Sequence, residues 1–165
     1  MKRLSALAVA FALTAFAFPA FAQEIKAGDL TIAKPWARAT PKGADVGVGY
    51  LEIRNAGAAA DRLTGGSADF ANVEVHQMSM DNGVMKMREM SGGLEIPAHG
   101  SVKLSPNGYH LMFTGLKHPL VKGDTVQATL NFEHAGAVTV KFPVQGVGAP
   151  APAAPKGDDM KGMKM

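Results

Sequence analysis

The sequence predicts an all-β domain, built as an antiparallel sandwich or barrel. Eight short runs rich in Val, Ile, Leu and aromatic residues are separated by segments rich in Gly, Pro, Asn and Asp. No stretch beyond the N-terminal apolar run has a sustained helical period that competes with these strands. The chain also has no cysteine, so an exported domain of this sequence depends on core packing and not on disulfides.

Residues 1–22 have the pattern of a cleaved signal peptide. Lys2 and Arg3 precede an apolar run, and the small residues around Ala22 form a cleavage site before Gln23. A signal anchor is the alternative, but the apolar run is short for a membrane span. We therefore expect an exported protein, with a β-sandwich domain over 23–148.

The chain is expected to end in a flexible Met-rich tail over 149–165, composed of Pro, Ala and small polar residues. The tail is either a solvated end or an auxiliary arm that binds the same ligand as the domain, because three methionines close it. Loss of the leader lowers Lys and Arg from 17 to 15, against 14 Asp and Glu. This near balance gives no reason to expect a nucleic-acid partner.

The expected strands, in chain order, are 30–38, 46–55, 72–80, 84–90, 101–105, 109–115, 125–133 and 137–144. The first two alternate apolar and polar residues on either side of the turn sequence TPKGAD. The segments NAGAAAD and TGGSADFA then predict loops. Each later pair of strands flanks a short turn sequence, namely DNG, SPNG and HAG.

The strand over 109–115 separates its side chains onto two faces. Tyr109, Leu111 and Phe113 form the natural core face, and His110 and Met112 are displayed on the opposite face. Residues two apart on a strand are about 7 Å apart, so two flexible side chains can converge on one ion. The alternative is that Met112 packs under a loop and His110 is solvated.

The segment 76–90 contains five of the ten methionines and the hairpin signal Asn82-Gly83. A two-residue loop pairs Met80 with Met85 and Met78 with Met87. One face of the hairpin then carries His76, Met78, Met80, Met85 and Met87. A three-residue loop would shift every partner by one.

A cluster of thioethers and imidazole without cysteine favours Cu(I). Zinc would recruit Cys, several His or a carboxylate, and calcium or magnesium would need oxygen ligands. The alternative is a methionine-lined core hairpin. That alternative accounts for Met85 or Met90 more easily than for His76 on the same face.

The order His76, ten residues, Met87, then His110-x-Met112 resembles the periplasmic copper chaperones of the PCuAC type, formerly called DUF461. KPWARATPKGADVGVGYLEI, DNGVMKMREM and the long segment after GLEIPAHG are also similar, so the resemblance covers roughly 30–144. It implies a cupredoxin-like Greek-key β-sandwich. Here 22 residues separate Met87 from His110, one more than the family spacing, so Met85 and Met90 stay open as substitutes for Met87.

The resemblance implies that Cu(I) is held by His76, Met87, His110 and Met112. It also implies a periplasmic carrier that delivers Cu(I) to the copper centre of cytochrome c oxidase, through subunit II or a Sco-type protein. We expect the mature chain to be a monomer. No nucleophile elbow, phosphate loop or paired-carboxylate motif predicts an enzyme. The rival hypothesis is an exported β-sandwich module that binds a protein or peptide through its Met-rich surface.

Overall fold

The computed structural model describes residues 24–148, and this part of the chain is all β, with no helix. The strands are β1 (Ile25–Ala27), β2 (Leu30–Arg38), β3 (Val46–Asn55), β4 (Asp61–Ala68), β5 (Ala71–Asp81), β6 (Val84–Glu89), β7 (Leu94–Ile96), β8 (Ser101–Lys103), β9 (Tyr109–Thr114), β10 (Thr125–Phe132) and β11 (Gly136–Gln145). The predicted signal peptide and tail lie outside the described residues. Within those residues, no helix is long and apolar enough to cross a membrane.

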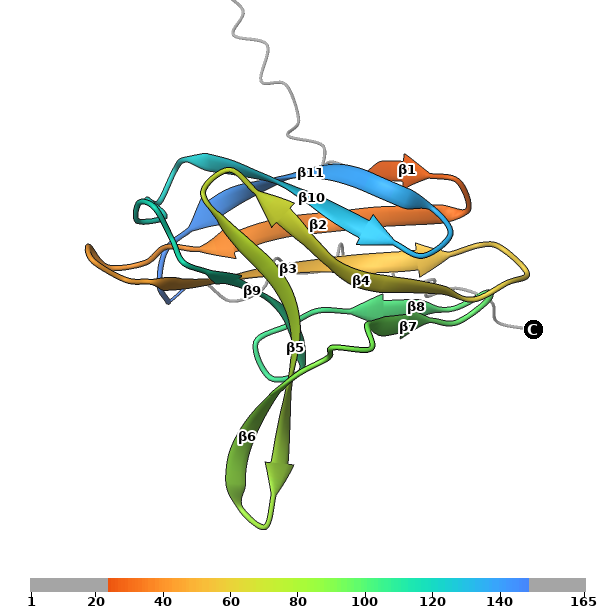
Figure 1. Ribbon diagram of the computed structural model, residues 1–165, viewed down its shortest axis with the longest axis horizontal. Helices are drawn as coiled ribbons and strands as arrows, with labels where there is room; N and C mark the ends of the chain where they lie inside the picture. The colour runs from red at the N-terminus through yellow and green to blue at the C-terminus, as the bar shows by residue number, and fades with distance from the viewer. Residues whose placement is uncertain (1–23, 149–165) are drawn as a thin grey trace, which may run out of the picture.

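The strands form a flattened barrel with two layers (Figure 1). The hydrogen-bonded order is β1-β2-β11-β10-β4-β5-β9-β3-β8, and an additional β2–β3 pairing joins the two layers. Only β11 and β2 are parallel among the paired strands of the described chain. The predicted all-β class is confirmed, and neighbours distant in sequence, such as β5 and β9, give it Greek-key connections.

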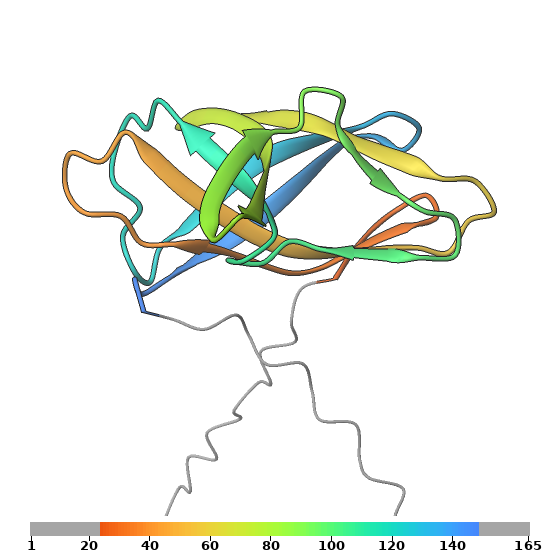
Figure 2. The same ribbon diagram turned by 90° about the horizontal axis from the view of Figure 1, so that it is seen from below.

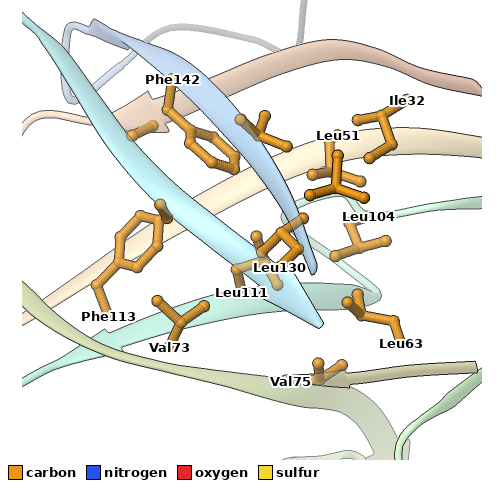
Figure 3. Packing of buried hydrophobic residues seen from close by; sticks show 14 of the residues in the cluster. Ile32, Leu51, Leu63, Val73, Val75, Leu104, Leu111, Phe113, Leu130 and Phe142 are labelled. Carbon is orange, nitrogen blue, oxygen red and sulfur yellow. The ribbon is translucent and has the colours of Figure 1, made fainter. Parts of the chain in front are cut away.

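The core lies between the two layers (Figure 3). Inward side chains from β2, β3, β9, β10 and β11 meet there, and the rings of Phe113 and Phe142 pack edge to face with centroids 5.8 Å apart. Full burial of a Leu or Phe side chain contributes about 1.5–3 kcal/mol. This core fixes the orientation of β9, because Leu111 and Phe113 are both fully buried in it.

The bounds of β2 and β3 agree with the prediction to the residue, whereas β1, β4 and β7 were not predicted. The error at β4 has a clear cause. Its Gly65-Gly66 pair reads as a loop, yet a Cβ at Gly66 would lie 2.3 Å from the Thr129 carbonyl oxygen on β10. Gly65 has φ +135° beside a shift in the β10–β4 register. Glycine is therefore required at the strand contact, and it does not mark a loop.

The β5–β6 hairpin projects away from the barrel (Figure 1) and points toward the viewer in Figure 2. Its register is the predicted one: Met80 pairs with Met85, and Met78 pairs with Met87. Asn82 and Gly83 form the two-residue loop, with φ +49° and +79°. These values are those of a type I′ turn, which matches the twist of a two-stranded hairpin.

Candidate metal centre

The two predicted ligands on β9 lie on the face opposite the core. His110 and Met112 alternate with the core residues Leu111 and Phe113, as expected. Their exposure differs from the expectation of a displayed pair, because His110 is 4% exposed and Met112 is 8% exposed. The cause is that β9 is an interior strand with β5 on one side and β3 on the other. Glu74 on β5 and Val48 on β3 are the register partners of Met112, so their side chains share this face.

The topology brings His76 and His110 together. His76 on β5 is the register partner of His110 on β9, so the two side chains share one face of the sheet. Their ring centroids are 5.9 Å apart, with an angle of 36° between the planes. An imidazole pair at this separation can bracket a single ion after small rotations of the rings.

His76 is held by a carboxylate and has one ring nitrogen without a partner. Nε2 lies 3.0 Å from Oε2 of Glu74, and Oε1 of Glu74 accepts a hydrogen bond from the Thr114 hydroxyl at 3.2 Å. A carboxylate accepts only, so in the neutral imidazole Nε2 carries the proton and Nδ1 carries the lone pair. Nδ1 is buried and has no hydrogen-bond partner among the described residues. A buried, unsatisfied acceptor is costly, and a bound metal ion would satisfy it.

The His110 imidazole has the tautomer and the neutral state that metal binding requires. Its Nδ1–H donates to the Gly108 carbonyl at 3.3 Å, which leaves the lone pair on Nε2. Burial lowers the pKa of His110 below its usual value; the bond to Gly108 opposes this shift, and the neighbouring His76 adds to it. The imidazole is therefore neutral at pH 7, which is the form that ligates metals.

The two predicted methionine ligands lie on either side of the histidine pair. Met112 is two residues from His110, in register with Glu74 on β5 and Val48 on β3. Met87 pairs with Met78 and is therefore a diagonal neighbour of His76, where side chains are about 7–8 Å apart. Met87 is 53% exposed, so its flexible thioether is free to swing toward the histidines.

The register also distinguishes Met87 from Met85 and Met90, the two residues that the sequence left open as alternative ligands. Met85 is one step farther toward the turn than Met87, opposite Met80. Met90 packs against the core, and its backbone N–H donates to the Val75 carbonyl. Of the three methionines, Met87 is thus the nearest in register to His76 on the ligand face.

Sequence reasoning missed Glu74 as the partner of His76. The signal was present, because a carboxylate two residues before a histidine on a strand lies on the same face. Among the described residues, no group of three or more His, Cys, Asp or Glu side chains could hold a metal ion. The nearby thioethers are therefore the candidates for further ligands beside the histidine pair.

Comparison with known proteins finds a matching family model and a similar relative. Residues 30–144 match the model of the LpqE-like family, described as "Putative lipoprotein LpqE-like". A relative from Leifsonia xyli subsp. xyli (strain CTCB07), named "Putative lipoprotein Lxx21020", is 30% identical over 121 residues, covering 73% of this chain and 72% of its own.

Two solved structures are similar over most of the domain. The copper-bound PCuAC domain from PmoF2 has a TM-score of 0.63 and 28% identity, covering 75% of this chain and 98% of its own. The solution structure of CuI-DR1885 from Deinococcus radiodurans has a TM-score of 0.55 and 26% identity, covering 76% of this chain and 83% of its own. The likeness therefore includes two proteins solved with copper.

Proposed function

The chain belongs to the LpqE-like family, and we propose that it is an exported copper chaperone that carries Cu(I) as its cargo. The proposed ligands are His76, Met87, His110 and Met112. Similarity to a copper-bound PCuAC domain and to a Cu(I)-bound structure supports the choice of metal. The chemistry of the donor set supports it independently, because thioethers and imidazoles are soft or borderline ligands that suit Cu(I).

The observation that carries the proposal is the buried Nδ1 of His76, which has no partner among the described residues and lies beside His110. A packing role for His76 would leave this acceptor unsatisfied, at a cost of about 1–3 kcal/mol. A metal role gives it a bond. The Glu74 carboxylate on the other ring nitrogen fixes the tautomer and orientation, as it does for many metal-bound histidines.

The site combines fixed and exchangeable ligands. His110 and Met112 are buried on an interior strand of the barrel, whereas Met87 is exposed on the projecting hairpin. An acceptor protein could therefore displace Met87 first, while the histidines still hold the ion. Stepwise exchange of this kind lets a carrier bind copper firmly and still release it to a partner.

The destination of the copper follows from the family resemblance. We propose delivery in the periplasm to the copper centre of cytochrome c oxidase, through subunit II or a Sco-type protein. Export through the predicted signal peptide is consistent with relatives that are named as lipoproteins. We propose that the carrier acts as a monomer and has no catalytic activity.

Anaerobic titration of the mature protein with Cu(I), in competition with a chromophoric chelator, tests the proposal. The parent is compared with His110→Ala and Met112→Ala, and with His118→Ala as a control at an exposed histidine. We expect tight binding in the parent and the control, weakened at least tenfold by each site substitution. Equal affinity in all four proteins would make the Met-rich face a protein or peptide contact surface instead.

A further inference from the structure

The β5–β6 hairpin carries four methionines on one face, beyond the histidine pair. They form two cross-strand pairs, Met78 with Met87 and Met80 with Met85. The Met90 N–H donates a hydrogen bond to the Val75 carbonyl, so Val75 and Met90 are a hydrogen-bonded pair. Hydrogen-bonded and non-hydrogen-bonded pairs alternate from there toward the turn. By that alternation, both methionine pairs occupy non-hydrogen-bonded positions, where opposed Cα atoms are about 4.5 Å apart and side chains are closest.

Packing does not account for the outer methionines. Met80 is 66% exposed and Met85 is 49% exposed, so neither fills a gap in the core. The whole of β6 is exposed along its length. The charged pair of Lys86 with Asp81 lies on the opposite face of the hairpin, which leaves the two methionine pairs as a surface of neutral thioethers.

We propose that Met78, Met80 and Met85 bind a second Cu(I) ion, at what we call the outer methionine site. Opposed side chains on a strand pair have Cβ atoms about 4.5–5.5 Å apart, and residues two apart on one strand are about 7 Å apart. Methionine has three rotatable side-chain bonds, so three thioether sulfurs can converge on one ion over these distances. Three neutral thioethers give a soft site that excludes hard cations.

The outer methionine site would also connect the turn of the hairpin to the histidine pair. Met87 lies opposite Met78 on one side and diagonal to His76 on the other. It can therefore exchange an ion between the two sites. The hairpin is held to the barrel near Met78, because the Met78 N–H donates a hydrogen bond to the Gly108 carbonyl in the loop that precedes β9. The inference goes beyond the proposed carrier function, which requires a single ion.

The test is an anaerobic Cu(I) titration of the mature full-length chain, compared with a Met80→Leu/Met85→Leu variant. Leucine keeps the apolar surface and removes both sulfurs. We expect the variant to bind one equivalent fewer than the parent, while the tail methionines are the same in both proteins. Met90→Leu is the matched control, because Met90 follows the last residue of β6 and packs against the core, and it should keep the parent stoichiometry.

A second measurement uses Ag(I) as a diamagnetic probe and follows the methionine methyl resonances by NMR. We expect the Met80 and Met85 methyl signals to shift in the parent and also in His110→Ala, which lacks an inner ligand. Unchanged stoichiometry in the double variant, with unshifted Met80 and Met85 methyl groups, would overturn the outer site. Failure of the proposed function is distinct, because it would show as Cu(I) affinity that His110→Ala leaves unaltered.

Discussion

Replacing Glu74 by Gln should weaken Cu(I) binding without touching any proposed ligand. The Glu74 carboxylate serves two donors at once, His76 Nε2 at 3.0 Å and the Thr114 hydroxyl at 3.2 Å. Glutamine retains one acceptor oxygen for His76 Nε2, and its amide NH2 can donate to the Thr114 hydroxyl oxygen in place of the bond that the carboxylate accepted. It also replaces a charge-assisted hydrogen bond to His76 with a neutral one.

The size of the effect follows from the loss of charge assistance in the hydrogen bond to His76. A hydrogen bond to a charged group contributes about 1.5–3 kcal/mol and a neutral one about 0.5–1.5 kcal/mol. The loss is therefore about 1–1.5 kcal/mol, which is close to a tenfold weaker affinity. This value lies at the lower end of the roughly 10–100-fold cost of losing an outer-shell partner of a metal ligand.

Glu89→Gln is the matched control. Glu89 is the register partner of His76 on β6, on the same face, and it makes no hydrogen bond to His76. Both substitutions remove one negative charge beside the same imidazole. In a chelator competition titration, we expect Glu74→Gln to lose about tenfold in Cu(I) affinity, as worked above, and Glu89→Gln to lose much less. An equal loss in both variants would show that the field of the charge, and not the orientation of His76, controls affinity, and the reasoning would be wrong.

Three further predictions concern the barrel and the ligand set. Asp61→Ala should destabilise folding by about 3 kcal/mol in urea unfolding, because its buried carboxylate accepts backbone N–H bonds from Arg62, His134 and Ala135. Burial raises the pKa of Asp61, but these three bonds and the nearby His134 side chain lower it by more, so the pKa lies below its usual value. The Asp61 carboxylate therefore stabilises the fold above its unfolded pKa of about 3.9, and this contribution is lost as pH falls below that value. Asp61→Asn should remove this part of the acid sensitivity of unfolding, and an unchanged acid profile would count against the role of Asp61. Gly66→Ala should lower the melting temperature by several degrees, because the added Cβ would meet a backbone oxygen on β10. Gly92→Ala is the control and should leave the melting temperature unchanged, because a Cβ there has no atom within 4 Å. Similar melting temperatures for the two variants would refute the close-contact argument. Met87→Leu should weaken Cu(I) binding more than Met85→Leu in the same chelator competition, and the reverse order would make Met85 the inner ligand.

Local chemistry made much of this fold predictable. The Asn82-Gly83 turn set the register of β5 and β6, because positive φ at two consecutive residues selects one hairpin geometry. Alternation placed His110 and Met112 on one face of β9. The strand β4 was not predictable, since the need for Gly66 arises from the approach of β10, a contact distant in sequence.

The central feature of the site was also beyond local reasoning. His76 and His110 meet because β5 and β9 are neighbours, and that pairing is a property of the whole barrel. Burial of His110 follows from the interior position of β9. The sequence could indicate which residues carry ligand chemistry, but the partner of each imidazole and the unsatisfied Nδ1 of His76 required the fold.

The most direct test of the central claim is a long-range ¹H–¹⁵N NMR spectrum of the histidine side chains, recorded before and after addition of one equivalent of Cu(I). The account predicts that His76 Nδ1 and His110 Nε2 change from free acceptor to metal-bound shifts. The other ring nitrogens of both residues should stay protonated, held by Glu74 and by the Gly108 carbonyl. Unchanged ¹⁵N shifts at both histidines, with copper bound elsewhere in the protein, would contradict it.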